Sequence, residues 1–161
     1  YNFPINIKLI ISNKENALGL LYAKRYSIPF KVIQFKNNLF EKKLINILNE
    51  KKIKLICLAG YMKILSKSFI NSFKGKIINI HPSLLPLYKG TNTFSRILKA
   101  QEIKTGCTVH FVNEKLDSGK IILQKSFEIG KNESILSLKK KTQKIEHKAF
   151  SQAITKLYML V

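Results

Sequence analysis

Short apolar runs alternate with amphipathic segments, and this alternation limits the fold more than any other feature of the sequence. The runs at 5–11, 30–35 and 53–59 have the length and composition of buried strands. Segments 15–26 and 39–52 lie between them with apolar residues close to helical spacing. Because parallel strands need crossover connections, this order predicts an α/β fold with a three-layer, mostly parallel, doubly wound sheet.

The second half of the chain continues the pattern. Its predicted elements are a short helix to about residue 73, a strand at 76–80, a helix at 93–100, strands at 105–112 and 120–127, and a helix from about Asn132 to the chain end. Leu138, Ile145, Ile154 and Leu157 are the expected buried stripe of this last helix. Without a repeat or linker, 1–161 is interpreted as a single domain.

The strong positive charge is the first candidate clue to function. A net charge of +20 would suit a nucleic-acid binder. However, only Arg25 and Arg96 among the 29 basic residues are arginine, and the lysines are scattered through every segment. Groove-reading proteins favour arginine for bidentate base contacts, so no specific nucleic-acid partner is predicted.

Other compositional features indicate an intracellular protein. No apolar run approaches the roughly 18 residues of a membrane span, and the first residues lack a signal-peptide pattern. Cys57 and Cys107 lie in apolar runs and are interpreted as buried thiols of a reducing compartment. A cytoplasmic protein without a membrane partner is therefore expected.

The stretch at 79–86, Asn-Ile-His-Pro-Ser-Leu-Leu-Pro, is the best guide to function. Residues i and i+2 of a strand point to one face, so Asn79 and His81 should project together from the carboxyl end of a strand. Ligands bind at that edge in open α/β sheets. The two prolines restrict the loop that follows.

The chain contains a single aspartate, Asp117, and three histidines, His81, His110 and His147. An aspartate in a loop that contains glycine can be a turn former or a lysine partner. Alternatively, its carboxylate can orient an imidazole and stabilise the charged form of the ring. His110 and His147 are each interpreted as structural or as a partner of the site residues.

Three ordered blocks together carry a resemblance to a known family. They are Ala-Gly-Tyr-Met-Lys-Ile-Leu at 59–65, the stretch at 79–86, and Leu-Asp-Ser-Gly at 116–119. In this combination the chain resembles phosphoribosylglycinamide formyltransferase, which has a Rossmann-like formyltransferase fold. The resemblance makes Asn79, His81 and Asp117 the expected catalytic residues.

The resemblance implies transfer of a formyl group from 10-formyltetrahydrofolate to the amine of glycinamide ribonucleotide, in de novo purine biosynthesis. It implies no metal, two small-molecule substrates, and a monomer or weak homodimer. The expected cofactor-binding residues are Tyr61, Met62, Lys63, Ile64, Leu65, Ile70, Leu116 and Asp117. The expected substrate-binding residues are Pro82, Gln143 and Glu146.

Some positions depart from the family pattern. Lys63 stands where the family commonly has arginine, and Asn92 where many relatives have histidine. Judged without the family, Gln143 and Glu146 would be an ordinary solvated helix surface. The family also begins with a strand, a glycine-rich phosphate loop and a helix, which this sequence lacks. The chain is therefore expected to be N-terminally incomplete, a fragment without the phosphate loop.

Alternative functions remain open at this point. Formyltetrahydrofolate deformylase and methionyl-tRNA formyltransferase share an Asn-x-His and a distant aspartate with the family. Pro82 directly after His81 favours the glycinamide enzyme over the deformylase, which commonly has a second histidine there. From a different class, an inactive basic nucleic-acid-binding relative would show strong salt-dependent RNA binding without folate binding.

Overall fold

The computed structural model describes residues 4–34 and 39–159. In chain order the elements are β1 (Ile10–Ser12), α1 (Leu18–Arg25), β2 (Phe30–Val32), α2 (Leu39–Glu50), β3 (Leu55–Leu58), α3 (Lys67–Ser72), β4 (Lys76–His81), α4 (Thr93–Lys99), β5 (Lys104–Phe111), β6 (Ile121–Glu128) and α5 (Ile135–Tyr158). Each helix and strand that the sequence predicts is present, with shifts at the ends. The expected strand end at Phe35 and helix end at Val161 lie outside the described residues.

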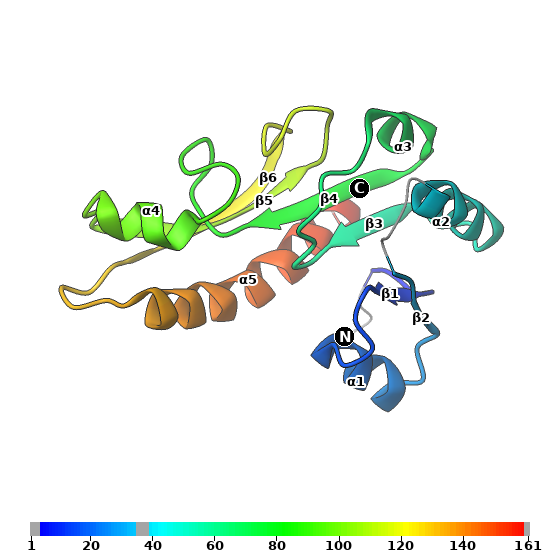
Figure 1. The fold of residues 1–161 in the computed structure, drawn as a ribbon, viewed down its shortest axis with the longest axis horizontal. Helices are drawn as coiled ribbons and strands as arrows, with labels where there is room; N and C mark the ends of the chain where they lie inside the picture. Colours follow the sequence, from blue (N-terminus) through cyan, green and yellow to red (C-terminus); the bar gives the residue numbers. More distant parts are fainter. Residues whose placement is uncertain (1–3, 35–38, 160–161) are drawn as a thin grey trace.

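The described strands form two sheets (Figure 1). β1 and β2 pair in parallel, and β3–β4–β5–β6 form a second sheet. Within the larger sheet β3 and β4 are parallel, whereas β5 and β6 each run antiparallel to the preceding strand. The β5–β6 connection at 112–120 contains no helix, so it cannot make the crossover that a parallel pair needs.

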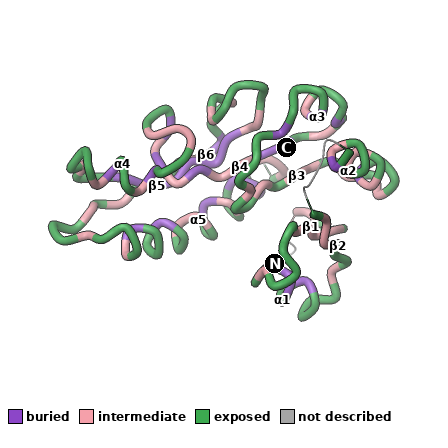
Figure 2. Tube along the Cα trace, viewed as in Figure 1, coloured by how far each residue is buried: buried purple, intermediate pink, exposed green. Residues whose placement is uncertain are grey.

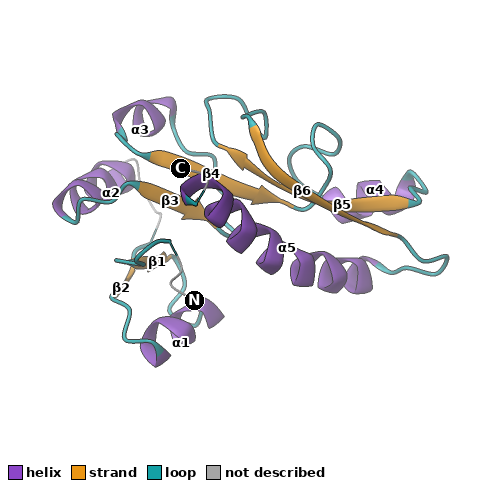
Figure 3. Ribbon diagram, turned by 180° about the vertical axis from the view of Figure 1, so that it is seen from behind, coloured by secondary structure: helices purple, strands orange, loops and turns teal. Residues whose placement is uncertain are grey.

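Helices cover both faces of the larger sheet, so the predicted three-layer α/β class is confirmed. Neighbouring side chains of a strand point to opposite faces. Ile78 belongs to a buried cluster with Ala149 and Ala153 of α5, while Ile77 joins Leu48 of α2 and Phe69 of α3. Figure 3 shows α5 lying along one face, and Figure 2 shows buried residues along the central strands.

The first strand is shorter than the sequence predicts. Residues 5–11 were expected to form it, but β1 spans only Ile10–Ser12. β2, the strand that pairs with it among the described residues, has three residues. The part of the run before Ile10 therefore has no neighbouring strand to pair with there. Ile5 instead packs against the core cluster beside α5.

The predicted start of the last helix at Asn132 is also wrong. The N-cap is Ser134, whose side chain accepts from the Ser137 N–H, while the Ser137 hydroxyl oxygen accepts from the Ser134 N–H. This reciprocal pair satisfies donors that the first turn leaves without helical partners. The expected stripe is confirmed, because Leu138 and Ile154 are buried and Ile145 and Leu157 pack against the core.

Burial of Cys57 is a further expectation that the structure contradicts. Cys107 is fully buried, but Cys57 is exposed. Cys57 lies on β3, the edge strand of the larger sheet, whereas α5 packs mainly over β5 and β6. Within 4–34 and 39–159, no helix has the length and apolar character to cross a bilayer.

Candidate active site

The carboxyl ends of β3 and β4 bring the first two sequence blocks together. These strands are parallel, with Leu58 of β3 beside Asn79 of β4. Loop 59–66 and loop 82–92 therefore leave the sheet at the same edge (Figure 1). β4 ends at His81, one residue beyond the predicted range 76–80, and Pro82 follows it directly. This edge is where open α/β sheets bind ligands.

The antiparallel register of β4 and β5 then adds a second pair of residues. Asn79 lies opposite His110, and His81 lies opposite Thr108. Opposite residues on one face are direct neighbours. Accordingly, the Asn79 Nδ2 atom lies 3.4 Å from His110 Nε2.

His81 is held between two hydrogen-bond acceptors. Its Nδ1 atom lies 3.3 Å from Asp117 Oδ2, and its Nε2 atom lies 2.9 Å from the backbone carbonyl oxygen of Tyr88. The His81 and Asp117 side chains are only 7% and 8% exposed. Because a carbonyl oxygen can only accept, Nε2 carries a hydrogen. The Nδ1 atom on the other side of the ring faces the Asp117 carboxylate.

Asp117 reaches His81 from the β5–β6 connection. Its Oδ2 atom also accepts from the Gly90 N–H at 2.9 Å, which ties loop 112–120 to loop 82–92. A further bond joins the loops, from Lys89 Nζ to Ser118 Oγ at 2.6 Å. At Gly119 a Cβ would overlap the Phe111 carbonyl oxygen, so the loop needs glycine there.

His110 makes closer contacts with the site than the sequence indicated. Its Nδ1 atom lies 2.8 Å from the Phe111 carbonyl oxygen, and its Nε2 atom lies 3.7 Å from Asp117 Oδ1. Burial lowers the pKa of His110, against the opposing effects of the Phe111 carbonyl and the Asp117 carboxylate. Desolvation therefore favours a neutral ring.

Sequence reasoning missed the polar contacts that hold loop 82–92. Thr108 Oγ1 accepts from the Leu85 N–H at 3.0 Å and donates to the Ser83 carbonyl at 2.7 Å. Gln124 Nε2 donates to the Leu85 carbonyl and to Thr108 Oγ1, both at 2.9 Å. Polar side chains inside apolar strands were the available signal, but their partners depend on strand register. The Tyr88 carbonyl and Gly90 N–H are backbone groups, which no motif reveals.

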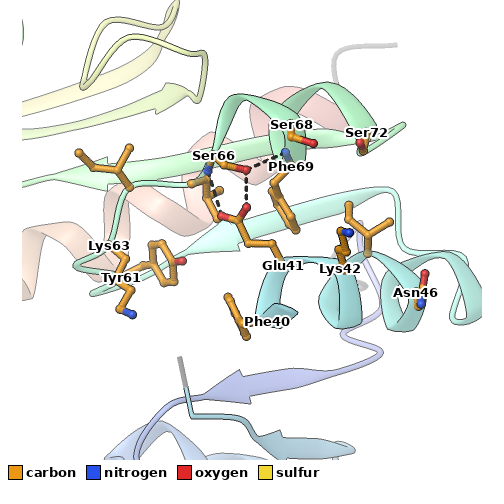
Figure 4. A pocket seen from close by; sticks show the side chains of 13 residues that line it. Phe40, Glu41, Lys42, Asn46, Tyr61, Lys63, Ser66, Ser68, Phe69 and Ser72 are labelled. Carbon is orange, nitrogen blue, oxygen red and sulfur yellow. Dashed lines mark hydrogen bonds between the residues drawn. The ribbon is translucent and has the colours of Figure 1, made fainter. Parts of the chain in front are cut away.

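The expected cofactor-binding residues fall into three environments. Tyr61, Lys63, Ile64 and Leu65 line an open pocket of about 940 Å³ beside α2 and α3. Figure 4 shows the carboxylate of Glu41 on the wall of this pocket, where it accepts from the Ser66 N–H at 2.9 Å and from its hydroxyl. Met62 is 82% exposed and Ile70 packs against the core. Leu116 lies beside Asp117 on loop 112–120.

The expected substrate-binding residues Gln143 and Glu146 lie on α5. This helix covers the face of the sheet that carries Ile78, so it is behind the face that carries Asn79 and His81. Gln143 is exposed, whereas burial raises the pKa of Glu146. Burial and the nearby Glu146 charge in turn raise the pKa of Cys107 to about 11. Only Pro82 of this group directly adjoins the Asn79–His81–Asp117 cluster.

The geometry describes an α/β domain with amide, imidazole and carboxylate groups gathered at a sheet edge. Among the described residues, no group of three His, Cys, Asp or Glu side chains is arranged to hold a metal ion. The formyl transferase family matches residues 2–154, and the chain belongs to this family.

Within the family, similar proteins are phosphoribosylglycinamide formyltransferases, as the three blocks implied. The chain is 43% identical over 157 residues to the Haemophilus influenzae enzyme, covering 95% of this chain and 74% of that protein. The crystal structure of the Anaplasma phagocytophilum enzyme matches with a TM-score of 0.90 and 36% identity, covering 97% of this chain and 76% of that one. The crystal structure of the Brucella melitensis enzyme matches with a TM-score of 0.89 and 37% identity, covering 98% of this chain and 83% of that one.

Longer relatives contain a corresponding region. The chain is 41% identical over 157 residues to the human trifunctional purine biosynthetic protein adenosine-3, covering 95% of this chain and 16% of that protein. The chicken protein of the same name is 42% identical over 152 residues, covering 92% of this chain and 15% of that protein. The chain therefore spans under a fifth of the length of these trifunctional relatives.

Proposed function

We propose that this chain transfers a formyl group from 10-formyltetrahydrofolate to the amine of glycinamide ribonucleotide, a step of de novo purine biosynthesis. The observation that carries the proposal is the cluster of Asn79, His81 and Asp117 at the carboxyl edge of β4. The relatives named phosphoribosylglycinamide formyltransferase support this choice of substrate.

The cluster fits the charges that develop in formyl transfer. The substrate amine attacks the formyl carbon, a C–N bond forms, and the carbonyl oxygen gains negative charge. An N–H of Asn79 and the protonated His81 stabilise that oxygen. Asp117, 3.3 Å from His81 Nδ1, stabilises the imidazolium.

The reaction is completed when the bond from the formyl carbon to the folate nitrogen breaks. The amine loses a proton and the departing folate nitrogen takes one, so no net proton is consumed. His81 or a water that it orients carries this proton. Nδ1 of His81 faces Asp117, so Nε2 is the nitrogen that serves the reacting groups, and its 2.9 Å contact with the Tyr88 carbonyl oxygen gives way in this step.

The folate is assigned to the loop that follows β3 and to the loop before β6. Tyr61, Met62, Lys63, Ile64 and Leu65 lie on the first, Ile70 packs behind them, and Leu116 and Asp117 lie on the second. Lys63 would contribute a point charge rather than a planar guanidinium contact. Pro82, Gln143 and Glu146 are assigned to the ribonucleotide.

The proposal is tested by incubating the full-length protein with 10-formyltetrahydrofolate, with and without glycinamide ribonucleotide. We expect formylated ribonucleotide and tetrahydrofolate in equal amounts, formed only when the ribonucleotide is present. Formate release without the ribonucleotide would instead identify a deformylase. Salt-dependent RNA binding without turnover would overturn the proposal in favour of a nucleic-acid-binding relative.

A further inference from the structure

His110 contacts both Asn79 and Asp117, yet the reaction described above gives it no task. We propose that His110 is a positioning residue that fixes the orientation of the Asn79 carboxamide, so that an N–H of Asn79 is presented to the reacting carbonyl oxygen. This inference rests on the proposed formyl transfer for its kinetic consequence. The side-chain geometry that underlies it is independent of that activity.

A backbone contact fixes the tautomer of His110. Its Nδ1 atom lies 2.8 Å from the Phe111 carbonyl oxygen, which has only lone pairs to offer. Nδ1 must therefore carry the hydrogen. In a neutral ring, Nε2 then holds a lone pair and acts as an acceptor.

The Asn79 carboxamide presents its amino end to His110. The atom that faces His110 Nε2 at 3.4 Å is Nδ2 of Asn79, a donor. A carboxamide has two N–H bonds on one end and a carbonyl oxygen on the other. Pairing one N–H with His110 leaves the second N–H available to a ligand. Rotating the carboxamide by half a turn would bring Oδ1 against the Nε2 lone pair, so His110 disfavours that orientation.

His110 has to stay neutral to hold Asn79 in this orientation. An added proton on Nε2 would oppose the N–H groups of Asn79 and turn the carboxamide around. It would also create a second cation 3.7 Å from Asp117, competing with His81 for the carboxylate. The pKa of His110 is lowered by burial and by the charges of His81 and Lys89. The Phe111 carbonyl and Asp117 act in the opposite direction. The His110 side chain is only 3% exposed, so water does not replace these neighbours.

The position of His110 in the sheet supports a specific role. His110 lies opposite Asn79 in the β4–β5 ladder, so the backbone sets the distance between the two side chains. Any residue at this position would fill space, but only one with an acceptor at the place of Nε2 can hold the Asn79 N–H. A role in packing alone predicts that an apolar residue of similar size would serve equally well.

The geometry is tested directly by ¹⁵N NMR of the histidine rings in the full-length protein at neutral pH. We expect His110 to show a protonated Nδ1 and an unprotonated Nε2. A ring protonated on Nε2, or on both nitrogens, would overturn the proposal. Because no substrate is added, this result stands even if the protein fails to transfer formyl groups.

The consequence is tested by steady-state kinetics of His110→Gln and His110→Leu. The glutamine amide oxygen can replace the Nε2 acceptor, while leucine cannot. We expect the leucine variant to lose up to about 100-fold in kcat, the scale of losing one oxyanion donor, with KM values within about twofold. Substantial rescue of kcat is expected in the glutamine variant. Equal kcat values in the two variants would overturn the proposal.

A double-mutant cycle separates positioning from folding. If His110 acts through Asn79, His110→Leu should cause no further loss of kcat in an Asn79→Ala background. Additive losses would contradict the proposal. Thr105→Ala, a buried truncation at the other end of β5, is the matched control and should lower stability with kcat retained.

Discussion

Oδ2 of Asp117 lies 3.3 Å from Nδ1 of His81 and 2.9 Å from the Gly90 backbone nitrogen. One carboxylate oxygen therefore orients the imidazole and fastens the loop that follows β4. The Tyr88 carbonyl, which holds the other ring nitrogen of His81, belongs to that same loop. Side-chain orientation and loop position are thus set together.

Asp117→Asn keeps the size of this side chain but removes its charge. We expect kcat for formyl transfer to fall by about 10²–10⁴-fold, because the imidazolium loses its counter-charge. Folate affinity should change little, since most of the expected folate contacts lie on loop 59–66. Steady-state kinetics and folate titration measure the two effects, and near-normal turnover would remove Asp117 from the mechanism.

Thr108→Val tests the polar contacts beneath loop 82–92. Valine leaves the Leu85 N–H and the Ser83 carbonyl without their buried partner. Each such group costs about 1–3 kcal/mol, so chemical denaturation should show a clear loss of unfolding free energy. Thr155→Val is the control, because that hydroxyl donates to the Ser151 carbonyl on an exposed part of α5. Equal effects of the two substitutions would contradict the assignment.

Two glycine-to-alanine changes should act in opposite directions. Gly119→Ala places a methyl group on the Phe111 carbonyl oxygen and must displace loop 112–120, which carries Asp117. We expect lower stability and lost activity. Gly19 lies in the first turn of α1 and no atom of the described residues is within 4 Å of its Cβ position, so Gly19→Ala should stabilise the protein by about 0.4–1 kcal/mol. Thermal unfolding of both variants checks the signs, and stabilisation by Gly119→Ala would refute the described packing.

Glu146→Gln should raise stability while weakening substrate binding. Burial raises the pKa of Glu146 above 4.5, so the folded state binds more protons than the unfolded chain between pH 4.5 and the folded pKa. Stability therefore falls as pH rises through that window. Glutamine carries no charge, so the variant should be more stable than the parent at pH 7 and equal to it well below pH 4.5. Denaturation at both pH values measures this.

The same variant should bind glycinamide ribonucleotide more weakly, with folate affinity unchanged. Glu50→Gln at the exposed end of α2 is the control, expected to leave stability at pH 7 and both affinities unchanged. Unchanged ribonucleotide affinity in Glu146→Gln would exclude Glu146 from the substrate site. A pH-independent stability difference would argue that the buried charge is not its cause.

Local patterns predicted the elements and part of the site, and long-range pairing explains what they missed. The two-residue period of a strand placed Asn79 and His81 on one face, and β4 ends where Pro82 indicated. Contacts of Thr108 and Gln124 depend on how β5 and β6 align with their neighbours, which no local pattern specifies. Cys57 shows the same dependence, because β3 lies at the sheet edge while α5 packs mainly over β5 and β6, so this one residue of an otherwise partly buried strand is exposed.

The direct pairing of Asn79 with His110 has a consequence for sequence divergence in the family. The strand pairing sets the distance between these two side chains. Insertions and deletions in 93–103, the part of the β4–β5 connection that carries α4, can therefore change the length of the connection without moving either side chain. A one-residue slip of β5 would be different, since it would turn His110 toward α5. The connection at the rim of the site can therefore vary in length, whereas the strand pairing beneath it admits no shift.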